Sequence, residues 1–102
     1  MKKIHLEFDF MGQHYFAIVR VRDKHPGKEF DITVLDWTLE RLLYGNHLIN
    51  EAYGALEANI IHQNKGQTEL KLIIASHLAS HLKMSCFVEG QCVHETPCSY
   101  SN

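Results

Sequence analysis

The chain has 102 residues, of which 45% are hydrophobic, 22% are charged and 10% are aromatic. This length and composition are typical of one globular domain and exclude a low-complexity or disordered chain. The net charge of -2, with histidine counted as neutral, provides no overall basic field for nucleic acid. We therefore expect a single domain over residues 1–102, with residues 90–102 as a candidate flexible tail.

Residues 3–22 contain two runs in which the pattern of side chains alternates with a period of two. The charged residues of the first run interrupt any apolar stretch that a secretory signal would need after the basic start of the chain. The second run follows a turn-like Met11 and Gly12. A period of two is typical of strands, so these residues predict an antiparallel hairpin. The apolar positions of the first run are Ile4, Leu6, Phe8 and Phe10.

A third strand and a helix are expected next. Pro26 and Gly27 mark a turn, and residues 30–34 alternate again, which completes a three-stranded meander. Asp36 can cap a helix that opens at Trp37, with leucines at helical spacing. Gly45 and Asn46 would end this helix.

The following segment gives conflicting signals. Residues 47–63 suit a helix in their first half and a strand in their second half, so the choice between the two stays open. We predict a strand over residues 56–62, a turn over residues 64–66 and a helix over residues 68–83 capped by Thr68. A last strand is expected near residues 86–88.

The expected fold class is α+β. It comprises an N-terminal antiparallel three-stranded meander, a further strand, and two helices packed on one face of the sheet. No segment approaches the roughly 18 apolar residues that a membrane span requires. The three cysteines are an odd number and a poor disulfide framework, so we expect a cytoplasmic location.

Residues 76–98 hold three histidines and all three cysteines of the chain. His77 and His81 are four residues apart and would share one helix face, where they could bind a metal such as zinc together with Cys92 and His94. However, the sequence lacks the glutamate of the H-E-x-x-H motif and the tight cysteine pairs of structural zinc sites. Interfacial or exposed histidines, and a buried Cys86, are the simpler interpretation.

The second run of alternation suggests an interaction surface. Phe16 and Ile18 are apolar on the face opposite the other apolar side chains, and Arg20 and Arg22 project from the same face. Such a face could bind a protein partner or a second copy of the chain. It could also contact single-stranded nucleic acid, although the acidic net charge argues against this.

No motif for catalysis is evident, because the chain has neither a phosphate-binding glycine loop nor a nucleophile elbow. Cys92 with His94 could be nominated as a nucleophile and base, but the signal is weak. We therefore predict a non-enzymatic binding or self-association module that acts through protein-protein contacts, including a homodimer, without a cofactor. The alternatives are a transition-metal-binding protein that uses the His/Cys cluster and a nucleic-acid-binding domain.

Overall fold

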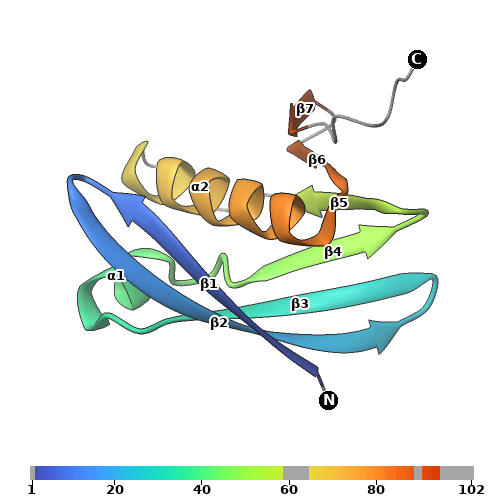
Figure 1. The fold of residues 1–102 in the computed structure, drawn as a ribbon, viewed down its shortest axis with the longest axis horizontal. Coiled ribbons are helices and arrows are strands. Elements are labelled where there is room, and N and C mark those ends of the chain that lie inside the picture. Colours follow the sequence, from blue (N-terminus) through green and yellow to red (C-terminus); the bar gives the residue numbers. More distant parts are fainter. Residues whose placement is uncertain (1, 59–64, 89–90, 95–102) are drawn as a thin grey trace.

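The computed structural model describes the backbone of residues 2–58, 65–88 and 91–94, and the side chains of residues 2–58 and 65–87. The described chain is a mixed α+β fold, as the sequence predicts, with a curled sheet and two helices, α1 (Trp37–Leu42) and α2 (Lys65–Leu82) (Figure 1). The strands lie across the sheet in chain order: β1 (Lys2–Phe10), β2 (Gln13–Lys24), β3 (Gly27–Val34), β4 (Leu48–Ala52), β5 (Ala55–Ala58), β6 (Ser85–Val88) and β7 (Gln91–His94).

The first three strands form the predicted antiparallel meander. Met11 and Gly12 connect β1 to β2 with φ values of 50° and 80°, which is the conformation of a type I′ turn and matches the twist of a hairpin. The register pairs Leu6 with Ala17 and Val19 with Ile32. Alternate side chains of the three strands therefore meet on one buried face: Ile4, Leu6, Phe8, Phe10, Ala17, Val19, Phe30, Ile32 and Val34.

The segment with conflicting signals forms a second hairpin. β4 and β5 are joined by Tyr53 and Gly54, whose φ values of 55° and 83° again define a tight turn. β4 pairs with the edge of β3 and buries Ile49 against the core. The predicted strand over residues 56–62 is present as β5 in its first part, and residues 59–62 lie outside the described residues.

The start of α1 agrees with the prediction from the sequence, whereas the start of α2 differs from it. Asp36 caps α1 as predicted, because its carboxylate accepts a hydrogen bond from the Leu39 N–H at 3.0 Å. By contrast, α2 begins at Lys65, so the predicted cap at Thr68 and the predicted turn at residues 65 and 66 are wrong. A glycine inside a helix costs only about 1 kcal/mol, which the burial of one helix face outweighs.

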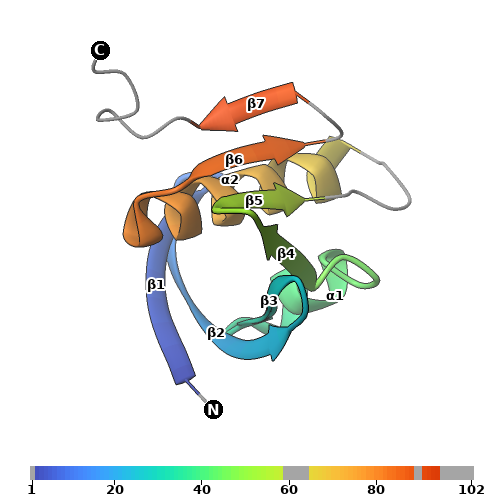
Figure 2. The ribbon, with the colours of Figure 1, turned by 90° about the vertical axis from the view of Figure 1, so that its right-hand side faces the viewer.

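The sheet curls around α2, which covers its inner face (Figure 2). The buried side of α2 consists mainly of Leu70, Ile74, Ala75, Leu78 and Ala79, all fully inaccessible. α1 is short and lies at the end of β3, where it buries Leu39. The prediction of two helices on one face is therefore correct for α2 and only partly correct for α1.

The C-terminal strands return to the sheet beyond α2. β6 confirms the strand expected near residues 86–88 and pairs parallel to β5, since the intervening helix carries the chain back across the sheet. β7 occupies residues 91–94 within the segment expected as a candidate tail, and residues 95–102 lie outside the described residues. In the described ranges, neither helix has the length and apolar character that a membrane span requires.

Candidate interaction surface

The four residues that the sequence assigns to an interaction surface lie on one face of β2. Phe16, Ile18, Arg20 and Arg22 point away from α2, while the intervening residues Ala17 and Val19 are buried beneath it. This outer face of the sheet is therefore the side that the helix α2 does not cover. Phe16 keeps 49% of its surface exposed and Ile18 is half-buried.

An apolar area extends from Phe16 onto the segment after β3. The Leu35 N–H donates a hydrogen bond to the Phe16 carbonyl at 2.9 Å, so the two residues are cross-strand neighbours on the outer face. Leu35 is 57% exposed and Trp37, two residues further along the chain, is 74% exposed. We call Phe16, Ile18, Leu35 and Trp37 the outer patch. Exposed apolar side chains that cluster in this way are typical of interaction sites.

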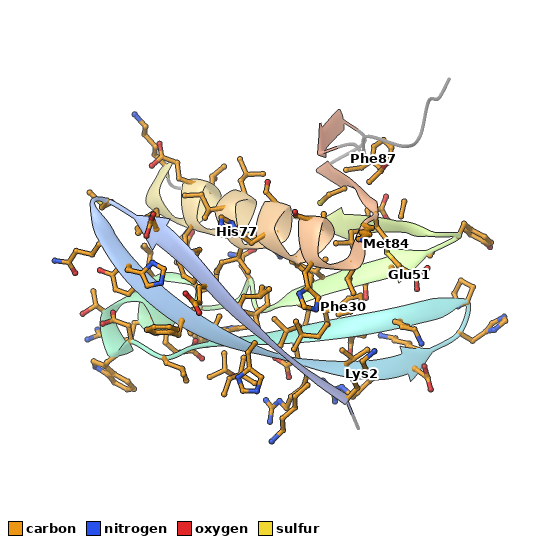
Figure 3. All side chains as sticks on the ribbon, viewed as in Figure 1. Lys2, Phe30, Glu51, His77, Met84 and Phe87 are labelled. Atoms are coloured by element: carbon orange, nitrogen blue, oxygen red, sulfur yellow. The ribbon has the colours of Figure 1, made fainter. Side chains whose placement is uncertain are left out.

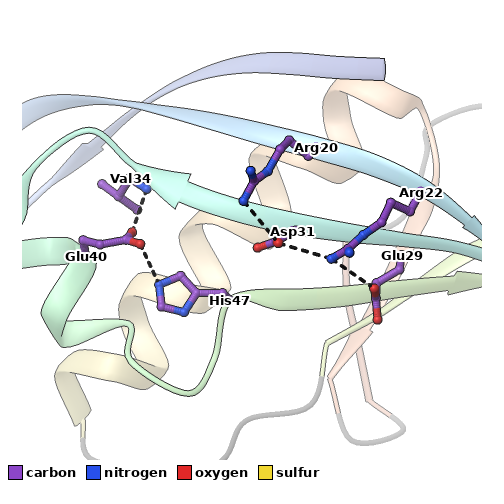
Figure 4. Close-up of polar contacts among 7 residues, drawn as sticks. All are labelled: Arg20, Arg22, Glu29, Asp31, Val34, Glu40 and His47. Carbon is purple, nitrogen blue, oxygen red and sulfur yellow. Dashed lines mark hydrogen bonds and ion pairs between the residues drawn. The ribbon is translucent and has the colours of Figure 1, made fainter. Parts of the chain in front are cut away.

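The arginines beside the outer patch are paired with carboxylates of β3 (Figure 4). Asp31 lies 3.4 Å from Arg20 and 3.3 Å from Arg22, and Arg22 also lies 3.4 Å from Glu29. Residues directly opposite on neighbouring strands interact in this way, and the register places Arg20 opposite Asp31 and Arg22 opposite Glu29. The four side chains of this ladder, Arg20, Arg22, Glu29 and Asp31, therefore carry no net charge, and Lys24 also lies 3.2 Å from Glu29.

Glu7 and Asp9 instead hold His14, on the other side of Phe16. His14 Nδ1 lies 2.7 Å from Asp9 Oδ1, and Nε2 lies 2.9 Å from Glu7 Oε1. The hydrogen bond to Asp9, and to a smaller extent the one to Glu7, raises the pKa of His14 above its ordinary value. The ring also packs edge-on against Phe16, with a centroid distance of 5.2 Å. The outer patch is thus bordered by a cation that two carboxylates fix in place.

Glu40 of α1 joins the helix to the end of β3 and to His47, and so supports the segment that contains Leu35 and Trp37 (Figure 4). Its carboxylate accepts a hydrogen bond from the Val34 N–H at 2.9 Å. Its second oxygen lies 3.0 Å from His47 Nε2, an ion-pair distance without hydrogen-bond alignment. Together with the Asp36 cap, these contacts hold α1 against the end of β3, so the outer patch is built on a fixed backbone.

The predicted metal ligands are only partly within the described residues. His77 and His81 lie on one exposed face of α2, as their spacing predicts. His77 Nδ1 donates to the Ile73 carbonyl at 2.9 Å and the ring packs against Phe8, which leaves Nε2 as the nitrogen that could bind a metal (Figure 3). Cys92 and His94 belong to β7, and their side chains lie outside the described residues.

Among the described side chains, no group of three or more His, Cys, Asp or Glu residues has an arrangement that could hold a metal ion. Cys86 is buried in the core, in agreement with the simpler interpretation of this cysteine.

Three features of the structure were missed in the sequence. Leu35 and Trp37 have ordinary positions in the pattern, and their exposure follows only from the bend between β3 and α1. Lys71 lies inside α2 with 2% of its surface exposed, and burial lowers its pKa to about 8. Its neighbours in the helix sequence, Leu70 and Leu72, give no sign that a lysine would face inward.

The third missed feature is a cavity of about 360 Å³ near the N-terminal end of β1, with apolar walls that include Phe30 and Met84 (Figure 3). Lys28 and Asp23 at its margin are paired with each other at 2.9 Å. This pairing raises the pKa of Lys28 and lowers that of Asp23. Because these charges already satisfy each other, the cavity offers weaker grounds for ligand binding than the outer patch offers for a protein contact.

Comparison with models of known protein families, with curated proteins and with solved structures gave no significant match. The functional interpretation therefore depends on the geometry of the chain itself.

Proposed function

We propose that the protein is a non-enzymatic binding module whose protein partner docks on the outer patch. The observation that carries this proposal is the exposure of Phe16 and Leu35, which are cross-strand neighbours on the outer face, and of Trp37, two residues beyond Leu35. Aromatic side chains in a well-supported position supply much of the binding energy at protein interfaces. The partner is expected to present an apolar side chain to Phe16 and Trp37.

The polar surroundings of the outer patch support a protein partner. Arg20, Arg22, Glu29 and Asp31 form a neutral ladder on one side, and the His14 cluster lies on the other. An apolar centre within a polar rim is the usual anatomy of a protein interface. A polyanion would have to displace the carboxylates from both arginines, so the neutral ladder disfavours the nucleic-acid alternative.

The metal alternative stays a prediction, because two of its four ligands, Cys92 and His94, have no described side chains. For location we propose the cytoplasm. The three cysteines of the chain are an odd number and a poor disulfide framework, which suits a reducing compartment.

Photo-crosslinking tests the proposal. A benzophenone amino acid at position 16, in cells that make the protein naturally, should give one discrete adduct with a partner protein. The matched control is the same amino acid at Tyr53, an aromatic residue that is 90% exposed in the turn between β4 and β5. An adduct at both positions would indicate random collision, and no adduct at position 16 would contradict the proposal.

Binding by purified components then measures the contribution of the outer patch. Calorimetric titration of the crosslinked partner should show that Trp37→Ala weakens binding by roughly tenfold or more, as expected of an aromatic anchor. Tyr53→Ala should leave the affinity within about twofold, because the loss of a residue outside an interface has little effect. Equal effects of the two substitutions would overturn the assignment of the outer patch.

A further inference from the structure

The free edge of β1 is a second surface with a specific geometry. β1 is the first strand of the sheet, and among the described strands only β2 pairs with it. It has nine residues, KKIHLEFDF, with neither proline nor glycine, and its register with β2 is continuous. Natural sheets usually protect such edges with short strands, bulges or prolines, because unpaired backbone groups invite another strand. This edge has none of those three protections, but it carries the charged side chains Lys3, Glu7 and Asp9, which also discourage pairing unless the added strand presents complementary charges.

The backbone groups at this edge belong to alternate residues. The Phe16 carbonyl accepts a hydrogen bond from Leu35, so it points towards β3 and away from β1. Glu7, which lies opposite Phe16, is therefore in a pair without hydrogen bonds, and its own N–H and carbonyl point to the free edge. Because the two kinds of pair alternate, the same holds at every second position. The residues that present backbone groups to the edge are Lys3, His5, Glu7 and Asp9, all with exposed side chains.

The order of charge along these four residues is complementary to itself when the strand is reversed. Two basic side chains, Lys3 and His5, precede two acidic ones, Glu7 and Asp9. In an antiparallel pair of identical strands centred on Leu6, Lys3 faces the second copy's Asp9 and His5 faces the second copy's Glu7. The Lys3–Asp9 pair brings opposite charges together at facing positions, which stabilises a sheet, and the His5–Glu7 pair sets an imidazole that can donate a hydrogen bond opposite a carboxylate.

We propose that two copies of the chain associate by antiparallel pairing of their β1 edges about a two-fold axis at Leu6. This register brings together the residues whose backbone groups point outward, so a continuous ladder of hydrogen bonds can form. It also uses the full nine residues of the strand. Such an interface is isologous, which is the commonest arrangement of homodimers.

The neighbouring registers are less favourable. If one strand slides by one residue relative to the other, each residue with outward-facing backbone groups lies opposite a residue whose backbone groups are already paired with β2. The ladder of hydrogen bonds between the two copies cannot then form. A pairing centred on Glu7 sets two carboxylates against each other, and one centred on His5 does the same with two imidazoles. Two carboxylates directly opposite are destabilising, each alternative keeps only one of the two kinds of facing base–carboxylate pair, and both shorten the overlap. The register centred on Leu6 is therefore the favoured one.

This dimer goes beyond the proposed function, because it uses the edge of β1 and leaves the outer patch free. Pairing at the edge extends the sheet, so the two α2 helices lie on the same side of the combined sheet. The two copies of the outer patch, including Phe16, then lie together on the opposite side. A dimer of this kind would present two docking surfaces to a bivalent partner.

The first test places a proline in β1 and measures the oligomeric state by sedimentation equilibrium. The N–H of His5 points away from β2, so His5→Pro removes a hydrogen bond only from the dimer. We expect the wild-type chain to be a dimer and His5→Pro to be a folded monomer, with native circular dichroism. His5→Ala is the matched control and should stay dimeric, since it keeps the N–H. A wild-type monomer, or a His5→Pro dimer of unchanged affinity, would overturn the proposal.

The second test reverses the charges of side chains on β1, and it remains informative even if the proline variant does not fold. An acidic variant (Lys3→Glu, His5→Glu) and a basic variant (Glu7→Lys, Asp9→Lys) each place like charges opposite each other in a homodimer. We expect the dimer Kd of each to rise by roughly tenfold or more. An equimolar mixture should form a heterodimer, because three of the four facing positions are then of opposite charge and the fourth sets His5 opposite a carboxylate. If mixing restores no association, the proposed register is wrong.

Substitution in the outer patch separates this proposal from the preceding one. Phe16→Asp should abolish binding of the crosslinked partner and leave the dimer Kd unchanged. If Phe16→Asp instead dissociates the dimer, self-association occurs through the outer patch and the edge proposal fails. If His5→Pro dissociates the dimer while no partner binds the outer patch, the proposed function fails and the edge proposal stands.

Discussion

Replacement of Glu40 by alanine should loosen the connection between α1 and the sheet. The Glu40 carboxylate is the acceptor for the Val34 N–H at 2.9 Å and lies 3.0 Å from His47 Nε2. Alanine removes both interactions and introduces no group that could replace them. Because this segment supports Leu35 and Trp37, the substitution tests whether the outer patch depends on the anchoring of α1.

The expected loss follows from the burial of the groups involved. The bond to Val34 is partly buried, and a backbone N–H that loses its acceptor in such a site costs about 1–3 kcal/mol. The contact with His47 is partly exposed, so it adds less than about 1 kcal/mol. We therefore expect the free energy of unfolding to fall by about 2 kcal/mol, a large share of the roughly 5–15 kcal/mol typical of a domain.

Urea unfolding followed by circular dichroism measures this loss, with an unchanged m-value as the sign of an intact native fold. Glu40→Gln separates the two contacts, because its amide oxygen can still accept from Val34, and it should lose less than half as much. Glu69→Ala replaces an exposed glutamate of α2 and should change stability by no more than about 0.5 kcal/mol. If Glu40→Ala were as stable as Glu69→Ala, the anchoring role would be refuted.

Three further predictions concern the backbone and the titration of single groups. Gly27→Ala should destabilise the protein by about 1–3 kcal/mol in urea unfolding, because the added Cβ would overlap the backbone carbonyl oxygen of Glu51. The pKa of His14 should lie above 6.5 by NMR titration and should fall in Asp9→Asn, so its stabilising contribution is present below pH 6.5 and is lost as pH rises through the folded-state pKa. The pKa of Lys71 falls to about 8 on folding, so the unfolded chain binds more protons between pH 8 and 10.5 and stability should rise with pH over that range. Lys71→Met should flatten this rise.

Each of these predictions has a contrary outcome. A Cβ added to Gly45 would meet no other atom within 4 Å, but the φ of this residue is 83°, so Gly45→Ala reports backbone strain alone and should cost less than Gly27→Ala. A His14 pKa that does not respond to Asp9→Asn would mean that the hydrogen bond at 2.7 Å does not form in solution. A stability profile that is flat from pH 8 to 10.5 in the wild type would show that Lys71 is hydrated in the folded protein.

The alternation of side chains was sufficient to predict the first three strands. The alternation covers residues 4–10, 14–22 and 30–34, and most of the apolar side chains on one face of these runs are buried in the structure. The cap at Asp36 was predictable for the same reason, since a single side chain satisfies a single backbone group nearby in the chain. Such local interactions depend little on what the rest of the chain does.

Short elements were not predictable in the same way. β4 and β5 have five and four residues, too few for a period to be distinguished from a helical one, and β4 forms because the edge of β3 is available to pair with it. The start of α2 was wrongly placed because Gly66 resembles a turn, whereas the packing of the helix against the sheet determines its length. Tertiary contacts decided these elements.

The candidate surfaces, too, were predictable from the sequence only in part. The sequence by itself determined that β2 carries Phe16 and Ile18 opposite its other apolar side chains, because the pleat of a strand fixes the face of each residue. It also determined the self-complementary charge order of β1. Only the tertiary structure decided that α2 covers the inner face, that Asp31 and Glu29 pair with Arg20 and Arg22, and that Leu35 lies beside Phe16. These facts arise from contacts between different segments of the chain. A strand pattern specifies which side chains share a face, and the packing of the whole chain specifies which face is left exposed.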